Sequence, residues 1–204
     1  MNIFVLHVIA KVAARMYCDK HVPKMVVELL QQMGTALIRH GATPDMMPLT
    51  KAGTPLKGGY PKHPCTRWCG HTRSNFIWAS RHALALCEEY TKRFGKTHFC
   101  EAGITKMTGM AYMIPEGDLT PFALAMPNEY RPDWRLPSMD TDAILVGLDK
   151  ETGEYVTTHA TNEIAVMAYR DYYIGAKEFA KWEKGTDAPD WWPHEKIHGT
   201  EVVA

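Results

Sequence analysis

Apolar residues recur at the spacing of an α-helix in two long stretches of the chain, residues 20–40 and 72–94. In the first stretch this stripe consists of Val22, Met25, Val26, Leu29, Met33 and Leu37. In the second it consists of Phe76, Ala79, Ala83, Leu86, Tyr90 and Phe94. Residues three or four apart share a helix face, so each stretch is predicted to be a helix that buries its stripe. Asp19 and Thr72 are the predicted N-caps, and Gly41 and Gly95 are the predicted stops.

Weaker patterns predict the remaining elements. Helices are expected over residues 11–17, 97–114 and 162–184, and residues 41–64 read as a long loop. Ile3, Val5 and Val8 predict a short buried strand, and residues 143–148 and 154–158 flank a turn-like segment that is typical of a β-hairpin. The predicted fold is mainly α, a single-domain helical bundle of residues 1–204 with a short N-terminal strand, a hairpin insertion at 141–160 and a tail at 185–204.

The charge balance limits the kinds of partner that fit this chain. It has 23 Lys and Arg residues against 23 Asp and Glu, which excludes a strongly basic protein that wraps DNA. Any nucleic acid must therefore bind weakly, through a local basic face. No run of about 18 apolar residues and no signal-peptide pattern is found, so no membrane contact and a cytoplasmic location are expected. The five cysteines are then expected to be reduced, without a structural disulfide.

A polar stripe runs beside the apolar stripe on each long helix. On residues 20–40 it contains His21, Lys24, Glu28 and Gln31. On residues 72–94 it contains Asn75, Trp78, His82, Glu89 and Arg93. One interpretation is structural: a solvated face on the first helix and an interhelical polar network on the second. The other is that the two stripes face each other and line one catalytic cavity, because a cation beside a carboxylate can perform acid–base chemistry.

Basic and aromatic residues alternate on the predicted helix over residues 162–184. Arg170, Tyr173, Lys177, Lys181 and Lys184 are spaced to share one face. Such a face suits a phosphate backbone with stackable bases, although a solvated basic face has the same pattern. Arg170, Tyr173, Lys177 and Lys181 are therefore the candidate DNA-binding residues.

Four metal-ligand types lie close together in the loop before the second long helix. They are His63, Cys65, Cys69 and His71, and Cys18 and His21 add two more elsewhere. The paired spacing of common zinc sites is absent, and buried free cysteine is a frequent core residue. No metal and no other cofactor is therefore predicted.

Several segments together resemble a phage-encoded family. They are CDKHVPKMVVELLQQ at 18–32, the segment from HPCTRWCGH to KRFGKTH at 63–98, the opening MNIFVL, YRDYYIGAKEFAKW at 169–182 and DWW at 190–192. Members of that family are often labelled pyrimidine-dimer DNA glycosylase, through a remote similarity to endonuclease V. The resemblance implies a helical enzyme that acts in the cytoplasm of the infected host cell. In endonuclease V-type enzymes the N-terminal amine attacks the sugar C1′ and an early-helix glutamate assists, a role that Glu28 matches.

The nucleophile is less directly matched than the glutamate. Endonuclease V-type enzymes have a small second residue, whereas this chain has Asn2, so the amine of Met1 or the side chain of Lys24 is the alternative. The first hypothesis is thus a DNA glycosylase/lyase, or an enzyme of phage DNA hypermodification that transfers a base or nucleotide. Its candidate catalytic residues are Glu28, Lys24, His21 and His82, and its candidate substrate-binding residues include Asn75, Trp78, Glu89 and Arg93. The alternative is a non-enzymatic phage protein that binds a host component.

Overall fold

Helices build most of the protein in the computed structural model, which describes residues 2–131, 144–148 and 155–193. The helices are α1 (Ala10–Arg15), α2 (His21–Arg39), α3 (Pro64–Cys69), α4 (Arg73–Phe94), α5 (Glu101–Thr108) and α6 (Ala160–Ala176), with short 3-10 turns η1 (Ala111–Met113) and η2 (Asn128–Tyr130). The strands are β1 (Ile144–Leu148) and β2 (Tyr155–His159). The prediction of a mainly α fold is confirmed.

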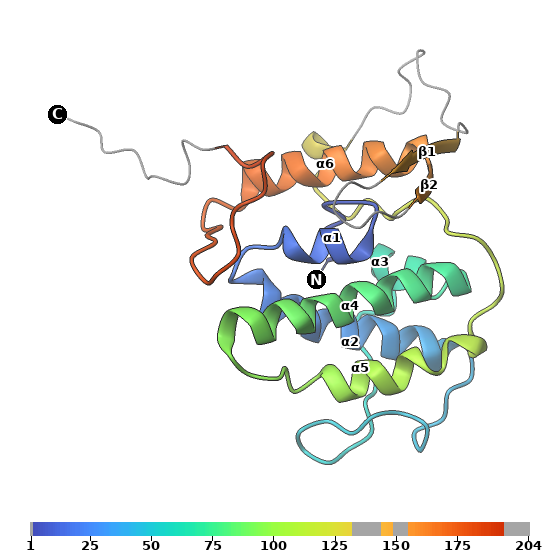
Figure 1. The fold of residues 1–204 in the computed structure, drawn as a ribbon. Helices are drawn as coiled ribbons and strands as arrows, with labels where there is room; N and C mark the ends of the chain where they lie inside the picture. Colours follow the sequence, from blue (N-terminus) through green and yellow to red (C-terminus); the bar gives the residue numbers. More distant parts are fainter. Residues whose placement is uncertain (1, 132–143, 149–154, 194–204) are drawn as a thin grey trace.

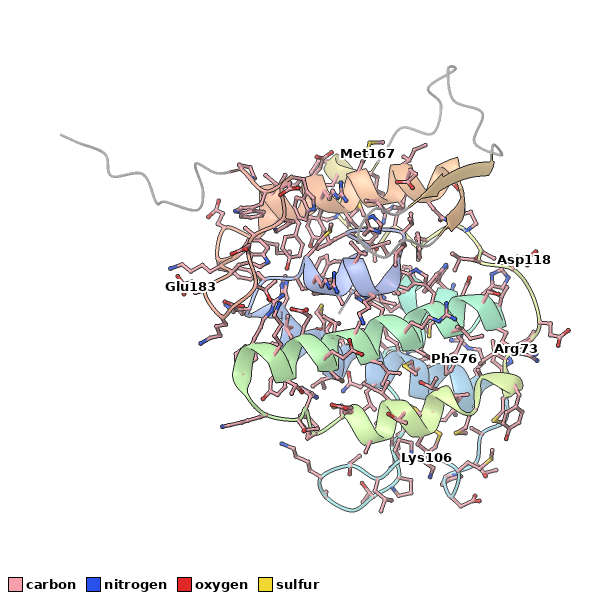
Figure 2. All side chains as sticks on the ribbon, in the orientation of Figure 1. Arg73, Phe76, Lys106, Asp118, Met167 and Glu183 are labelled. Atoms are coloured by element: carbon pink, nitrogen blue, oxygen red, sulfur yellow. The ribbon has the colours of Figure 1, made fainter. Side chains whose placement is uncertain are left out.

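Helix α4 lies at the centre of the helical stack. It packs against α1 on one side and against α2 and α5 on the other. Figure 1 shows α6 on the far side of α1, so that α1 and the N-terminal segment lie between α6 and α4. In Figure 2, Phe76 points into the interior from α4, whereas Met167 lies on the outer side of α6. The predicted apolar stripe of α2 is buried throughout, and that of α4 is buried up to Leu86.

The boundaries of the two long helices follow local capping, with one exception. The Thr72 hydroxyl accepts a hydrogen bond from the Asn75 N–H, and Gly95 ends α4 with φ +66°. Helix α2 begins after Lys20 without a side-chain cap, so the prediction of Asp19 as N-cap is wrong. The Asp19 carboxylate is instead bound by Arg93 and by the backbone N–H of Glu183, because tertiary partners compete with the cap.

The predicted N-terminal strand is wrong, although its burial is correct. Residues 3–6 are buried, but within the described residues they pair with no other strand. A buried carbonyl or N–H without a partner costs about 1–3 kcal/mol, so this segment needs other partners. Side chains of other elements bind this segment and its flanks: Glu28 Oε2 accepts from the Asn2 N–H, and donors bind the carbonyls of Phe4 (Tyr17), Leu6 (Arg170), Val8 (Trp78) and Ala10 (His82).

Two of the predicted helices are shorter in the structure. Helix α6 ends at Ala176, and the Ala180 N–H closes the following turn on the Lys177 carbonyl, after which the Asp19 N–H binds the carbonyl of Lys181. Helix α5 begins only at Glu101, since His98 Nδ1 accepts from the Cys100 N–H and fixes a turn before it. Both ends are set by contacts that helical periodicity does not encode.

The predicted hairpin and tail fall partly outside the described residues. Strands β1 and β2 pair antiparallel with Ile144 opposite His159, but the connection at 149–154 is not described, so the hairpin insertion as a whole stays a prediction. The described start of the predicted tail packs on the core, where Trp192 is 2% exposed and contacts Tyr173. None of the helices in the described ranges combines the length and the apolar character needed to cross a bilayer.

The Tyr17 hydroxyl supports the N-terminal segment from the inside, and its removal should be costly. It donates to the Phe4 carbonyl at 2.8 Å and lies 3.1 Å from His82 Nε2. We expect Tyr17→Phe to lower the free energy of unfolding by about 1–3 kcal/mol, because the buried Phe4 carbonyl loses its donor. Urea unfolding measures this. The control Tyr112→Phe removes a hydroxyl from a ring that is 65% exposed and should change stability by less than about 0.5 kcal/mol. Equal effects of the two variants would contradict the structural role.

Candidate functional site

Asn75, at the start of the polar stripe of α4, binds the loop that passes over the helix. Its Nδ2 donates to the Trp68 carbonyl at 2.9 Å and to Thr120 Oγ1 at 2.7 Å. Its Oδ1 accepts from the Thr120 N–H at 2.9 Å. The side chain is 0% exposed and its amide is fully used, so Asn75 anchors Thr120 against α4.

His82, in the middle of the same stripe, is also fully buried. Its Nδ1 lies 2.9 Å from the Ala10 carbonyl, and its ring stacks on Trp78 at 5.1 Å between centroids. Because a carbonyl only accepts, Nδ1 carries the proton and Nε2 is an acceptor, 3.1 Å from the Tyr17 hydroxyl that donates to the Phe4 carbonyl. Burial lowers the pKa of His82 to about 4, so the ring is neutral at physiological pH.

Glu89 and Arg93 form a buried ion cluster at the end of the stripe. The Arg93 guanidinium donates to Glu89 Oε2 at 2.8 and 3.0 Å and to Asp19 Oδ1 at 3.2 Å. It also binds the carbonyls of Arg15 and Tyr17. Such a cluster joins α4 to the end of α1 and the chain before α2, and it leaves no donor of Arg93 directed to solvent.

The stripe of α2 contains a charged pair that reaches the surface. Lys24 Nζ lies 3.5 Å from Glu28 Oε1, and Glu28 Oε2 accepts from the Asn2 N–H at 2.8 Å. The Lys24 side chain is 62% exposed, whereas that of Glu28 is 11% exposed. An accessible amine thus lies beside a fixed, nearly buried carboxylate, which is an arrangement suited to proton transfer.

His21 lies next to this pair under a set of aromatic rings. Its Nδ1 shares a hydrogen bond of 2.6 Å with the Tyr173 hydroxyl, and its ring stacks on Phe4 at 5.0 Å and meets Phe179 edge-on at 5.3 Å. Burial, together with the positive charges of Lys177, Lys24 and Lys20, lowers the pKa of His21 to about 3. His21 is therefore a neutral side chain that supports the rings.

Those lysines and the outer rings together form what we call the lysine–aromatic surface, defined by Lys20, Lys24, Lys177, Tyr172 and Phe179. The Lys177 ammonium lies 4.2 Å from the centroid of the Tyr172 ring, and that of Lys20 lies 4.4 Å from the Phe179 centroid. Among the described residues, neither of these two lysines makes an ion pair with a carboxylate. Cations beside aromatic rings at the surface are suited to phosphate and base contacts.

The basic stripe predicted for residues 162–184 is only partly assembled. Tyr173 is 0% exposed, and Arg170 Nε donates to the Leu6 carbonyl at 3.0 Å. Lys181 lies beyond the end of α6 and pairs with Glu183 at 3.4 Å. The prediction of one helical face is wrong because α6 stops at Ala176, and of this set only Lys177 belongs to the lysine–aromatic surface.

Tyr17 lies between the two stripes, since its hydroxyl is 3.1 Å from His82 Nε2 and its ring centroid is 6.3 Å from that of His21. Asn75 and His82 have no exposed surface, so the expectation that they share a solvent-open cavity with Lys24 and Glu28 is wrong. Lys20 and Phe179 were missed as site residues. They lie on different segments, and the only signal in the sequence was the alternation of basic and aromatic residues that also contains Lys177.

The candidate metal ligands are dispersed. His63 Nδ1 accepts from the Cys65 N–H as the N-cap of α3, Cys65 and Cys69 are buried, and His71 is exposed. In the described ranges no three His, Cys, Asp or Glu side chains are grouped to hold a metal ion. All five cysteines are free buried thiols, and burial raises the pKa of Cys65 to about 11. No family model, curated protein or solved structure matches the chain.

The lowered pKa of buried His98 adds to the pH dependence of stability that two other buried histidines, His21 and His82, predict. Both have folded-state pKa values, about 3 for His21 and about 4 for His82, below the ordinary value of 6.5. The unfolded chain therefore binds more protons below pH 6.5, and the free energy of unfolding falls as the pH decreases. The slope should approach about 1.4 kcal/mol per pH unit for each histidine. Urea unfolding between pH 7.5 and 5 measures it, in a window where most carboxylates remain charged.

Variants assign that slope to particular residues. His82→Gln should reduce the slope by about one histidine's share, independently of its effect on stability at pH 7.5. His71→Gln removes an exposed ring that is in water in both states and should leave the slope as it is. A free energy of unfolding that stays constant between pH 7.5 and 5 in the unsubstituted protein would show that the buried rings take up protons while folded.

Proposed function

We propose that the protein is an enzyme that acts on bases in DNA, with Lys24 and Glu28 as its reactive pair. The observation that carries the proposal is the exposed Lys24 amine 3.5 Å from a Glu28 carboxylate that the Asn2 N–H holds in place. The resemblance of residues 18–32 and 63–98 to phage proteins labelled as DNA glycosylases supports the same reaction class.

The pair has the groups that a glycosylase/lyase needs. In the proposed step Glu28 takes a proton from the Lys24 ammonium, and Lys24 Nζ forms a bond to the sugar C1′. The C1′–N glycosidic bond breaks, its electron pair goes to the base, and Glu28 returns the proton to the leaving base. The hydrogen bond from Asn2 fixes one carboxylate oxygen, so the other is directed to the amine. No metal and no other cofactor takes part in this scheme.

The lysine–aromatic surface is the proposed DNA contact. Lys20 and Lys177, like Lys24, supply positive charge near His21, and Tyr172 and Phe179 are the proposed rings for contact with an unstacked base. In this scheme His21 supports the rings, and His82, Asn75 and Arg93 hold the segments that shape the site without touching substrate. The net charge of zero limits DNA binding to this local surface.

The closed stripe of α4 favours a second candidate, a non-enzymatic protein that binds a host component. His82 and Asn75 are 0% exposed and their polar atoms are occupied, which is the pattern of a structural network. Under this candidate the Lys24–Glu28 pair is only a surface ion pair. A nucleotide or base transferase of phage DNA modification is the remaining enzyme class, and it uses the same surface.

DNA binding should depend strongly on salt and on the lysine–aromatic surface. If Lys20, Lys24 and Lys177 each neutralise a phosphate, the slope of log K against log salt on duplex DNA should be about −2 to −3. Lys20→Ala and Lys177→Ala should each flatten it by about one unit, as measured by fluorescence anisotropy at several salt concentrations.

The matched control is Lys181→Ala, which removes a lysine that is 70% exposed and paired with Glu183. The slope measured for this variant should equal that of the unsubstituted protein. Absence of binding at low salt, or equal effects of the Lys177 and Lys181 variants, would mean that this surface does not bind DNA.

Covalent trapping tests the reactive pair. A lyase that forms an imine with abasic DNA is captured by sodium borohydride, and mass spectrometry of the adduct should place it on Lys24. Lys24→Arg should abolish the adduct. Glu28→Gln retains an oxygen that accepts from the Asn2 N–H, so we expect it to fold normally but to cleave dimer-containing and abasic DNA at least about 100-fold more slowly.

Lys11 and Glu88 form a comparable surface pair at 3.3 Å and provide the matched control. Lys11→Arg and Glu88→Gln should leave trapping and cleavage unchanged. An adduct on the N-terminal amine would still indicate a lyase, but it would show that this amine, and not Lys24, is the nucleophile. No adduct and no cleavage by the unsubstituted protein would overturn the glycosylase reaction, and the interaction protein would then be the better candidate.

A further inference from the structure

A cavity of about 540 Å³ lies between α2, α5 and the loop before α3, and it plays no part in the proposed DNA chemistry. Its walls are mainly apolar and include Val27, Leu30, Met47, Pro48, Leu56 and Cys100. Cavities of about 300–1,000 Å³ with apolar walls and a few polar groups are typical of small-molecule sites. Val27 and Leu30 occupy the face of α2 next to Lys24, so the two sites use different sides of one helix.

The charges that line this cavity have one sign. Lys51 and Lys106 are its charged lining residues. The Lys51 ammonium lies 4.0 Å from the centroid of Phe99, and Lys106 Nζ donates to the Met47 carbonyl at 3.2 Å. Figure 2 shows Lys106 on α5, at the side that faces the long loop. Two ammonium groups beside an apolar interior favour a ligand with a negative group at one end.

Two large apolar side chains of the lining are exposed. Leu49 is 68% exposed and Phe99 is 57% exposed, although both line the cavity. Burial of a side chain of this size stabilises by about 1.5–3 kcal/mol, so a ligand that covers them gains affinity. Burial raises the pKa of the Cys100 thiol to about 11, which keeps it uncharged and makes it an apolar part of the wall.

The loop that forms the outer wall is held against the helices at defined points. A Cβ on Gly103 would lie 3.1 Å from Leu30 Cδ1 and 3.2 Å from Pro48 Cβ, so the glycine lets the loop approach α5. The Thr35 hydroxyl accepts from the Gly59 N–H at 2.7 Å and donates to the Gly59 carbonyl at 2.8 Å. These contacts fix both ends of the wall and preserve the cavity without a ligand.

We propose that this cavity binds a small amphiphilic anion, with an aromatic or aliphatic body between Leu30, Met47 and Phe99 and its negative group at Lys51 and Lys106. The apolar body replaces water at the walls and covers the exposed rim. The carboxylate, sulfonate or phosphate stays at the opening, where the two ammonium groups are. This assignment is independent of Lys24 and Glu28, so failure of the DNA chemistry leaves it intact.

The probe for this site is 1-anilinonaphthalene-8-sulfonate, a two-ring body with one sulfonate, titrated into the full chain with fluorescence as readout. We expect saturable binding of one molecule per chain. Ala102 lines the cavity and is exposed, so Ala102→Trp places an indole at the opening and should abolish this binding. Thermal unfolding of the variant without probe checks that it folds.

Charge is tested separately from shape. Lys51→Glu should weaken binding of the sulfonate roughly tenfold, whereas Lys92→Glu, the same charge change on the exposed side of α4, should change it less than about twofold. The uncharged N-phenyl-1-naphthylamine should bind both variants equally. No saturable binding of either probe, or full binding by Ala102→Trp, would overturn the cavity assignment. Equal effects of Lys51→Glu and Lys92→Glu on the sulfonate would overturn the anion preference.

Discussion

The buried backbone at the N-terminus is the constraint on which the rest of the structure depends. Residues 3–6 are enclosed by helices, and within the described part of the chain they have no strand partner. Their polar groups must still be hydrogen-bonded, because water is excluded from the interior. Side chains of Tyr17 and α6 bind carbonyls within residues 3–6, and side chains of α2 and α4 bind the flanking Asn2 and Val8, so the positions of α2, α4 and α6 are coupled to one short segment. The helices in turn cannot separate without leaving several carbonyls unsatisfied.

This constraint explains why polar residues that suggest chemistry are used for structure. Histidine, tryptophan, asparagine and arginine donate to carbonyls while they present apolar surface, so they can replace a strand edge inside a helical core. His82 and Trp78 donate in this way to the carbonyls of Ala10 and Val8, and Arg93 donates to the Arg15 carbonyl at the end of α1. Burial also keeps His21 and His82 neutral, which makes the packing sensitive to acid. A polar stripe beside an apolar stripe is thus compatible with a catalytic cavity or with a core that encloses backbone.

Helix α2 carries three different environments around its circumference. Its apolar stripe faces the core, its Lys24–Glu28 edge meets the lysine–aromatic surface, and its Val27–Leu30 side lines the cavity under the long loop. Glu28 belongs to two of them, since one oxygen holds the Asn2 backbone and the other meets Lys24. The carboxylate is therefore positioned by the fold before any ligand arrives, as a group that performs chemistry needs to be. The cavity side has no carboxylate in its lining, so the ligands suited to the two surfaces differ.

Local sequence determined the two long helices, because their apolar spacing, the Thr72 cap and the Gly95 stop act within a few residues. It also identified the buried residues at the N-terminus, since burial follows from apolar character. Their partners were decided only by the tertiary structure, because periodicity does not report which atoms will accept or donate across 70 or more residues, as between Trp78 and Val8. The segment after α6 is likewise bound by Asp19, which lies far away in sequence. For the site, helical spacing placed Lys24 beside Glu28 within one helix. Lys177 and Phe179 came close to Lys20 and Lys24 only because the segment after α6 packs against the start of α2. Contacts between distant segments depend on the whole set of packed surfaces, and no single stretch of sequence contains that information.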